Sequence, residues 1–472
     1  MADNEWTKRL SRRRLLHGAG ALAGASALSA LVAACGGSNG PGTGSTPSSA
    51  GGTAAAKANP VDSVDLTGKK VQLTLWHHLT GNNANAFQSI VDAFNSSQDA
   101  VTVQAQNQGN SYDDLYKKLL TAAAASGLPD LAEAYPNQVS DYEGSNSVVV
   151  LDDYINSSKY GLTKAEQDDF VKPYWNESIY PEYGGKHLSF PFSKSFLVMY
   201  YNADKLKALN YPKTPDQWTW DDFVAVAKAA NSSGTKGWII NIDPSTMDMM
   251  VFSRGGKLIS DDQKHWLYNQ PPGVDSLSLH QQAVRDGWGY LGSSSNSGAV
   301  DFGAGRVLMD FATSAGLASE AKQVAGDGKF NWSISLPPHN AGVSPVTVLY
   351  GGSITAFKST PERQLGAWLF MKYFSSPDVT AKWSLATGYA PLRQSAVQSD
   401  AVQQAIKNDP RFGVLVNQIA QYGKPGTSVH GTADMRGFMS DAMTQAVTQP
   451  NANPKTILDA VVQKADQATA QS

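Results

Sequence analysis

Residues 186–202, KHLSFPFSKSFLVMYYN, place the strongest constraint on the fold of this chain. A β-rich run reaches Pro191, bends through Phe192 and Ser193, and resumes as the apolar run FLVMYY. Proline fixes its own φ and has no N–H to donate, so it ends a strand ladder rather than lying in the middle of a sheet. The stretch therefore predicts a strand that leaves one lobe, crosses a hinge and becomes a strand of a second lobe.

Residues 346–357, VTVLYGGSITAF, repeat this pattern with a corner of small residues at Gly351, Gly352 and Ser353. We interpret this segment as a second hinge crossing that returns to the first lobe. A chain of 472 residues with 41% apolar composition is too long for one hydrophobic core, and two lobes of ordinary size accommodate it.

Strands and helices alternate after residue 70. The pattern predicts a strand at residues 71–76, a helix at 83–95, a strand at 101–106, a helix at 111–126 and a third strand from Leu131. This alternation indicates βαβ units with a parallel sheet. The predicted fold class is α/β.

The amino-terminal 34 residues have the features of an export signal. The run SRRRLL is followed by small, weakly apolar residues up to Ala34, which is typical of the positive region and the short apolar region of a signal peptide. A membrane span would need about twenty strongly apolar residues, so we interpret the segment as an export signal and not as a span. The run resembles a twin-arginine signal with Leu15 in place of the usual Phe, and a Sec signal with additional arginines is the alternative.

Cys35 is the single cysteine, and it closes the sequence LVAAC, which looks like a bacterial lipobox. We expect its thiol to be diacylated after cleavage, which would anchor the protein to the membrane surface without a span. Residues 36–59 are rich in Gly, Ser, Thr and Pro and lack large apolar side chains. They predict a flexible tether before a globular body that begins near Val64.

Charge and motifs exclude several functions. Beyond the first 34 residues, the chain carries 33 Lys and Arg against 39 Asp and Glu, a net charge of −6, and this balance gives no basic stripe for nucleic acid. The sequence contains no GxSxG, HExxH, CxxC or Walker A motif. His77 and His78 could ligate a metal, but adjacent residues of a strand face opposite ways, so we expect neither a metal nor a cofactor.

Aromatic residues make up 10% of the chain and recur at predicted strand-to-loop junctions. Open α/β sheets bind ligands at such strand ends, where planar rings can stack on a sugar or polyol. Core packing is the alternative for any single ring. The candidate rings are Trp76, Tyr112, Tyr135, Trp238, Tyr350 and Tyr389.

Four cationic residues are candidates for binding a phosphate or a carboxylate. Arg393 and Arg436 could each form a forked contact with such a group, and Lys194 and Arg306 are weaker candidates. A surface salt bridge is the alternative for each of them.

Taken together, these segments resemble extracellular solute-binding proteins of ABC importers, the class that includes maltose-binding and glycerol-3-phosphate-binding proteins. The resemblance covers nearly all of residues 71–446 as an ordered series of segments. The segments that resemble the glycerol-3-phosphate and glycerophosphodiester branch are Trp76-His77 with Gly81, residues 109–112, Pro129-Asp130, residues 190–193 with 200–202, Thr313-Ser314, Gly351-Gly352 and residues 387–392.

The resemblance implies a two-lobed periplasmic-binding-protein fold, with a hinge of crossing strands and the ligand cleft between the lobes. It also implies ligand contacts at Tyr112, Ser193 or Ser195, Ser314, Gly352, Tyr389 and Arg436. Trp76, His77, Tyr135, Trp238 and Gly351 complete the candidate ligand-binding set. Two departures, Pro136 where the branch has an acidic residue and Ser245 near its stacking tryptophan, leave a neutral oligosaccharide and a phosphorylated ligand both open.

The predicted function is that of a membrane-anchored, monomeric receptor outside the cytoplasm, which closes on a carbohydrate or sugar-like polyol and delivers it to an ABC permease. The alternatives are a receptor for glycerol-3-phosphate or a glycerophosphodiester, a secreted carbohydrate-active enzyme using a carboxylate pair such as Asp113 and Asp243, and a lipoprotein scaffold without a ligand. The predicted domains are a signal at residues 1–34, a lipidated tether at 35–63, one lobe at 64–192 with about 352–395, and another at 193–351 with about 396–472.

Overall fold

The computed structural model describes residues 58–294 and 297–470. The predicted signal, Cys35 and most of the predicted tether lie outside these residues. The described body begins before Val64, because Pro60–Ser63 form a 3-10 helix in which Val61 is buried. Asp62 accepts hydrogen bonds from Ser157 and Ser158, and these bonds fix this helix to the body.

The first of two large sheets has five strands in the order β2-β1-β3-β13-β6. Its β1, β2 and β3 are parallel, and β13 is antiparallel to both β3 and β6. These strands are β1 (Val71–His77), β2 (Val101–Asn107), β3 (Leu131–Ala134), β6 (Phe190–Pro191) and β13 (Ser353–Ala356). The parallel βαβ pattern predicted for residues 71–134 is confirmed.

The second sheet is ordered β14-β12-β7-β10-β8-β9, with β11 also paired to β7. Strand β7 is its centre, since it pairs antiparallel with β10, β11 and β12. The strands are β7 (Ser195–Asn202), β8 (Lys236–Ile240), β9 (Gly289–Leu291), β10 (Val307–Thr313), β11 (Trp332–Ser335), β12 (Thr347–Tyr350) and β14 (Gly423–Lys424). A separate small ladder joins β4 (Ile179–Tyr180) to β5 (Lys186–His187).

The helices before β7 are α1 (Gly81–Ser97), α2 (Tyr112–Ala124), α3 (Pro136–Glu143), α4 (Asp152–Ile155), α5 (Lys164–Asp168) and α6 (Lys172–Glu177). Between β7 and β12 lie α7 (Ala203–Ala208), α8 (Trp220–Ser232), α9 (Pro244–Ser253), α10 (Pro271–Arg285), α11 (Ser297–Gly303) and α12 (Leu317–Gln323). After β13 come α13 (Pro361–Phe374), α14 (Pro377–Thr387), α15 (Gln394–Val397), α16 (Asp400–Asn408), α17 (Pro410–Val414), α18 (Thr432–Thr448) and α19 (Pro454–Thr469).

Local sequence signals account for several helix boundaries. The Thr219 hydroxyl accepts from the Asp222 amide, and the Asp222 carboxylate accepts from the Thr219 amide, which forms the capping box at the start of α8. Thr360 caps α13, with Pro361 at its first position. Helix α10 ends at Arg285, and Gly289–Leu291 then pair as β9 with β8.

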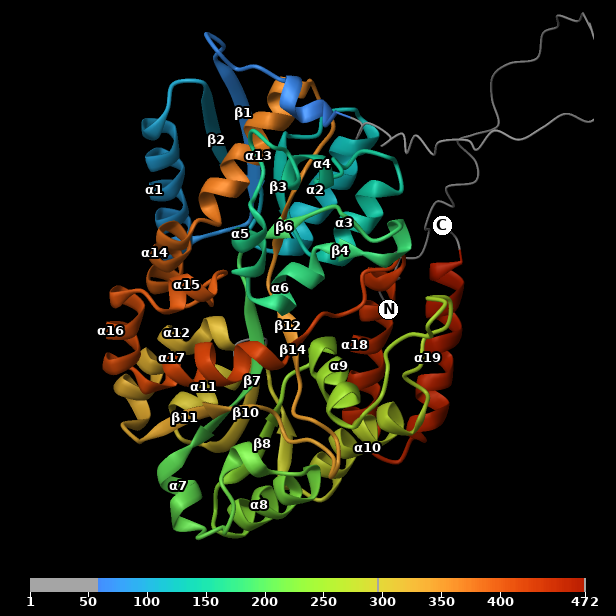
Figure 1. Cartoon of the computed structure of the whole chain (residues 1–472). Helices are drawn as coiled ribbons and strands as arrows, with labels where there is room; N and C mark the ends of the chain where they lie inside the picture. The colour runs from blue at the N-terminus through green and yellow to red at the C-terminus, as the bar shows by residue number, and fades with distance from the viewer. Residues whose placement is uncertain (1–57, 295–296, 471–472) are drawn as a thin grey trace, which may run out of the picture. The chain divides into compact units, whose positions relative to one another are not determined.

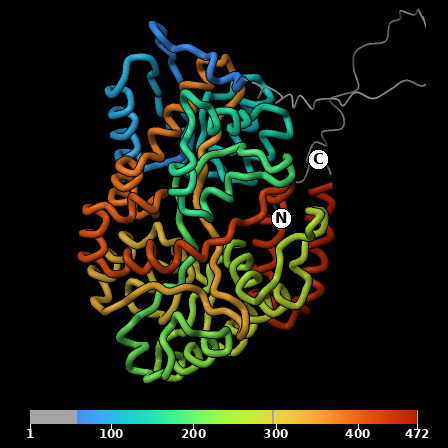
Figure 2. Tube along the Cα trace, viewed as in Figure 1, coloured from blue at the N-terminus to red at the C-terminus, as the bar shows by residue number. Residues whose placement is uncertain are grey.

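Two segments carry the chain between the sheets. We call residues 192–194, between β6 and β7, the first crossing, and Gly351-Gly352, between β12 and β13, the second crossing; both can be followed in Figures 1 and 2. The crossings touch, because the Ser193 amide donates to the Gly352 carbonyl at 3.1 Å. The predicted hinge of crossing strands, with Pro191 ending one ladder, is confirmed.

The strands of the two sheets fall within the residue ranges predicted for the two lobes, and the exact lobe boundaries stay a prediction. Aromatic side chains fill the region around the crossings. Phe192 packs on Phe374 with ring centroids 4.5 Å apart, and Phe196 packs on Tyr174 at 5.8 Å. Among the described residues, no helix is both long and apolar enough to cross a membrane.

Candidate functional site

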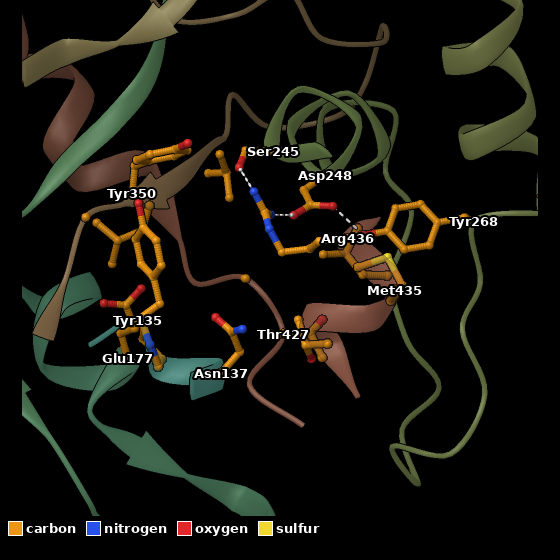
Figure 3. Close-up of a pocket in the computed structure, with 17 residues that line it drawn as sticks. Tyr135, Asn137, Glu177, Ser245, Asp248, Tyr268, Tyr350, Thr427, Met435 and Arg436 are labelled. Atoms are coloured by element: carbon orange, nitrogen blue, oxygen red, sulfur yellow. Dashed lines mark hydrogen bonds and ion pairs between the residues drawn. The ribbon is translucent and has the colours of Figure 1, made fainter. Parts of the chain in front are cut away.

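A cavity of about 70 Å³ lies beside the second crossing, lined by β12 and by helices and loops that follow strands of both sheets. Tyr135 and Asn137 reach it from the start of α3, and Tyr350, at the end of β12, lies beside Tyr135 (Figure 3). Ser245 and Asp248 of α9 and Arg436 of α18 lie across the cavity from Tyr135. We call it the central cavity; its lining is Tyr135, Pro136, Asn137, Glu177, Ser245, Asp248, Leu258, Tyr268, Val348, Leu349, Tyr350, Gly351, Gly426, Thr427, Thr432, Met435 and Arg436.

Two larger hollows adjoin the central cavity. One, of about 370 Å³, shares Glu177, Leu258 and Thr427 with it. The other, of about 640 Å³, shares Tyr135 and Arg436. Through these shared residues the three spaces form one continuous cleft.

Arg436, on α18, lies on the floor of the central cavity and is surrounded by acceptors (Figure 3). Its Nη2 donates to the Ser245 hydroxyl at 2.9 Å and lies 3.5 Å from Asp243 Oδ1, and its Nη1 lies 3.6 Å from Asp248 Oδ2. Burial alone would lower the pKa of Arg436, but Asp248 and Asp243 together raise it. The guanidinium is therefore charged, and two carboxylates compensate its charge.

Asp248 is the more deeply placed of these carboxylates. Burial raises its pKa to about 6, against the opposing effects of Arg436 and of the Tyr268 hydroxyl, which donates to it. Without Arg436 the buried carboxylate of Asp248 would lose its cation, whereas the Asp243 side chain keeps 27% of its surface exposed. This floor offers both hydrogen-bond donors and acceptors, which is the combination that sugar hydroxyl groups need.

Aromatic rings from different elements lie close together at the central cavity. The Tyr135 ring lies 3.9 Å from that of Tyr112 and 6.2 Å, edge to face, from that of Tyr350. Burial and the charge of Glu133 raise the pKa of Tyr389, which is nine-tenths buried nearby and stacks on Trp383 at 5.9 Å. Tyr135 follows β3 of the first sheet and Tyr350 ends β12 of the second, so the two sheets each supply a ring to the cavity.

A buried ion pair ties the first crossing to the cavity wall. The wholly buried Lys194 donates to the Glu177 carboxylate and to the Ser353 hydroxyl, the latter at 2.9 Å. Burial raises the pKa of Glu177, and Lys194 opposes this effect. Lys194 thus has its partners within the hinge and is not available as a ligand-binding cation.

Of the candidate rings and ligand-binding residues chosen from the sequence, the structure brings seven to the cleft or its edge. Tyr135, Tyr350, Gly351 and Arg436 line the central cavity, and Tyr112 lines the adjoining hollow. Gly352 lies under Tyr112, because a Cβ built on it would come within 2.5 Å of the Tyr112 hydroxyl. Tyr389 lies close enough to Glu133 and Tyr350 for their charges to add to the effect of burial in raising its pKa.

The other candidates lie elsewhere. His77 packs edge to face on Phe87, and Trp76 donates to Gln106 at 3.1 Å. Trp238 is 1% exposed in the core beside Trp288 and His280. Ser193, Ser195 and Ser314 are buried at the hinge, where Ser195 accepts from Thr313 and Ser314 accepts from the Phe196 amide.

Arg393 and Arg306 do not reach the central cavity. Arg393 is buried over the Phe170 ring and donates to backbone carbonyls, while Arg306 pairs with Asp301 at 2.6 Å. No group of three or more His, Cys, Asp or Glu able to hold a metal ion occurs within residues 58–294 and 297–470.

Sequence reasoning missed several residues of the site. They are Glu133, Asn137, Glu177, Asp248, Tyr268 and Thr427. Asp248 and Tyr268 lie on segments with no recognisable motif, and only the fold brings them to Arg436. A weak signal existed for Asn137, which directly follows the Tyr135-Pro136 helix start.

A family model described as "Bacterial extracellular solute-binding protein" matches residues 89–411. Among curated relatives, the sn-glycerol-3-phosphate-binding periplasmic protein UgpB of Escherichia coli (strain K12) is 21% identical over 414 residues, covering 84% of this chain and 92% of the relative. UgpB of Salmonella typhi is 22% identical over 427 residues, covering 86% and 94%.

Solved structures share the fold. The cyclic alpha-maltosyl-1,6-maltose binding protein of Arthrobacter globiformis matches with a TM-score of 0.71 at 21% identity, covering 85% of this chain and 100% of that one. UgpB of Mycobacterium tuberculosis, in complex with glycerophosphocholine, matches with a TM-score of 0.71 at 18% identity, covering 85% and 98%. The maltotriose-binding protein of Thermus thermophilus, bound with maltotriose, matches with a TM-score of 0.64 at 18% identity, covering 84% and 99%.

These likenesses confirm the predicted two-lobed fold with a hinge of crossing strands. They also confirm the prediction of a receptor rather than an enzyme, because the family consists of binding proteins that act outside the cytoplasm. This chain belongs to the family of bacterial extracellular solute-binding proteins.

Proposed function

We propose that the protein captures a neutral carbohydrate or sugar-like polyol by closure of its two lobes and delivers it to an ABC permease. The observation that carries this proposal is the compensated charge of Arg436. A phosphate placed on this guanidinium would also lie close to Asp243 and Asp248, and like charges at such distances repel. A neutral solute meets no such penalty.

The hydrogen-bonding groups of the central cavity support the same choice. Among the described residues, the side chains of Asn137 and Thr427 line the cavity and have no protein hydrogen-bond partner. The hydroxyl and amide groups can donate and accept, and Tyr135 and Tyr350 supply ring faces and edges. Because these groups come from segments that adjoin strands of both sheets, a solute that contacts all of them binds the closed form best and shifts the protein toward it.

A glycerophosphodiester is the second candidate, and one observation favours it. Relatives named for sn-glycerol-3-phosphate binding cover most of this chain, and a solved structure of the same fold holds glycerophosphocholine. For such a ligand Arg436 would have to exchange a carboxylate partner for the phosphate. The pKa of Asp248 is raised to about 6, so its carboxyl group is protonated below that pH. Replacing Asp248 by the phosphate as the partner of Arg436 therefore costs least at low pH.

Anchoring completes the proposal. The LVAAC sequence supports lipidation at Cys35, and the Gly/Ser/Thr/Pro tether would let a monomeric body reach its permease. Metabolic labelling with a fatty acid, compared between the wild type and Cys35→Ser, tests the anchor: label on the variant would contradict it.

Thermal shift and titration calorimetry test the ligand class. The panel contains glucose, maltotriose and other neutral oligosaccharides, with sn-glycerol-3-phosphate and glycerophosphocholine as the phosphorylated arm. We expect a neutral member to raise the melting temperature and to bind with one-to-one stoichiometry without turnover. Tightest binding by a phosphorylated member would reject the neutral class, and cleavage of the sugar would reject the receptor.

An Arg436→Met variant sharpens this test. We expect it to weaken binding of the neutral solute by at least tenfold, because it removes the donor on the cavity floor. Lys455→Met is the matched control, since Lys455 pairs with Asp459 on the surface of α19. Unchanged affinity in Arg436→Met, with the control also unchanged, would remove Arg436 from the site.

A further inference from the structure

Glu133, in β3, is a buried carboxylate that does not line the central cavity. It is 1% exposed, its Oε1 accepts from the Tyr112 hydroxyl at 2.7 Å, and its Oε2 lies 2.9 Å from His78 Nδ1. Both carboxylate oxygens are therefore occupied by side chains that lead toward the cleft. An acid at this depth is retained only where such partners compensate it.

Tyr112 is fully engaged by its neighbours. Its hydroxyl is bound to Glu133, and its ring lies between the His78 ring at 3.8 Å and the Tyr135 ring at 3.9 Å. These two rings occupy both faces of Tyr112, so a solute can reach only the remaining surface that faces the adjoining hollow. Its contribution to the site is to support Tyr135, the next ring along, which does line the central cavity.

Gly352 of the second crossing packs against Tyr112 and Glu133. A Cβ on Gly352 would lie 2.5 Å from the Tyr112 hydroxyl oxygen and 3.1 Å from Glu133 Cγ. Glycine at this position thus lets the Glu133–Tyr112 hydrogen bond form directly against the hinge. Glu133, Tyr112 and Gly352 make up one packed unit below Tyr135.

From this arrangement we infer that Glu133 is a positioning residue for the solute site: acting through Tyr112, it fixes the Tyr135 ring against which the solute binds. The expected effect of Glu133 on solute binding rests on the proposed function. The geometric part, that Glu133 orients Tyr135 through Tyr112, does not depend on which solute is bound. Residues of this kind hold a binding group in its productive geometry without touching the ligand.

Binding of maltotriose to the full-length protein and its variants provides the first test. Glu133→Ala and Tyr112→Phe each remove the same hydrogen bond, and we expect each to weaken binding about tenfold, the effect of one charge-assisted hydrogen bond. Because they act in series, the double variant should bind no more weakly than either single variant. Glu133→Gln can still accept from Tyr112, and we expect its affinity to stay within about twofold of the wild type.

Glu362→Ala is the matched control, since it removes a more exposed glutamate that pairs with Lys69 at 2.6 Å. It should leave the affinity unchanged. Losses from Glu133→Ala and Tyr112→Phe that multiply in the double variant would overturn the inference. So would a Glu133→Ala variant with a lowered melting temperature but the affinity of the wild type.

A measurement without ligand separates this inference from the proposed function. In protein labelled with 3-fluorotyrosine, the fluorine resonance of Tyr135 is assigned from a Tyr135→Phe variant. We expect the line to shift or broaden in both Glu133→Ala and Tyr112→Phe, and to keep its position in Glu133→Gln. An unchanged Tyr135 line in Glu133→Ala would reject the positioning role, whereas failure of every neutral member of the panel to bind the wild type would count against the proposed solute class alone.

Discussion

Glu320, in α12, shows what a buried acid costs when no cation accompanies it. The residue is 4% exposed, and its Oε2 has no hydrogen-bond partner among the described residues. Burial raises its pKa from 4.5 to about 7. Glu177 differs because Lys194 lies against it.

The raised pKa predicts a pH-dependent stability. Because the folded-state pKa lies above the ordinary value, the stabilising contribution is complete below about pH 4.5 and is lost as the pH rises through about 7. We expect Glu320→Gln to raise the free energy of unfolding at pH 8 by about 1–3 kcal/mol and to leave it almost unchanged at pH 4. Urea unfolding at both pH values measures the difference.

Asp99→Asn is the control for this prediction, since Asp99 is exposed and follows α1. It should change stability by the same small amount at both pH values. A gain from Glu320→Gln that is equal at pH 4 and pH 8 would show that the carboxyl group does not titrate in this range.

Which individual residues line the site was the hardest feature to predict from the sequence. Arg436 was a candidate because of its charge, and the structure places it in the cavity, but its partners Asp248 and Tyr268 come from distant segments. Trp238 satisfied the same strand-end criterion as Tyr135, yet its ring lies among Trp288 and His280 in the core. Which face of a sheet is covered depends on long-range packing that local sequence does not record.

The two crossings are the elements on which the site depends. Gly351 has a φ of +94°, and a Cβ built on it would lie 2.0 Å from the Ser193 carbonyl oxygen of the first crossing. These crossings were predictable because proline and paired glycines leave a local signature. Strands β1 to β3 were predictable for a similar reason, the alternation of strand and helix periods.

Gly351→Ala tests how tightly the crossings pack. A left-handed backbone conformation costs a non-glycine residue about 1–2 kcal/mol, and the overlap with Ser193 adds about 1–3 kcal/mol. Gly342→Ala isolates the first cost, because Gly342 has a φ of +79° and no atom within 4 Å of a Cβ built on it. We expect thermal unfolding to show a clearly larger loss for Gly351→Ala; equal losses would mean that the crossings can separate at little cost.

At the scale of the whole described body, polar contacts away from the hinge join the segment after β14 to α3 and to the 3-10 helix Pro181–Tyr183. His430 Nδ1 lies 2.9 Å from Asp141 Oδ1, and the Ser428 hydroxyl donates to Glu182 at 3.1 Å. Asp141 lies on α3, which follows β3, whereas residues 425–431 follow β14. These contacts can form only when the two parts approach, so they favour the form that encloses the cavity.

His430→Ala should therefore weaken solute binding with little effect on the melting temperature. A partly exposed pair contributes about 0.2–1 kcal/mol, which corresponds to a loss of up to about fivefold in affinity. His265→Ala is the control, because His265 pairs at 3.2 Å with Asp466, which lies on α19. Titration calorimetry measures the affinity of His430→Ala and of His265→Ala for whichever solute of the ligand panel binds the wild type. An equal loss of affinity in the two variants would contradict the role of the His430 contact.

The second crossing also determines the order in which the protein can be assembled. Strand β3 pairs on one side with β1, close by in sequence, and on the other with β13, which follows all of the second sheet except β14. A nascent chain that stops before Ser353 leaves one edge of β3 unpaired, and its residues Leu131–Ala134 are all buried in the finished protein. Open apolar edges promote aggregation. The first lobe must therefore wait for most of the second to be synthesised, and fragments cut at the first crossing should not yield a soluble amino-terminal half.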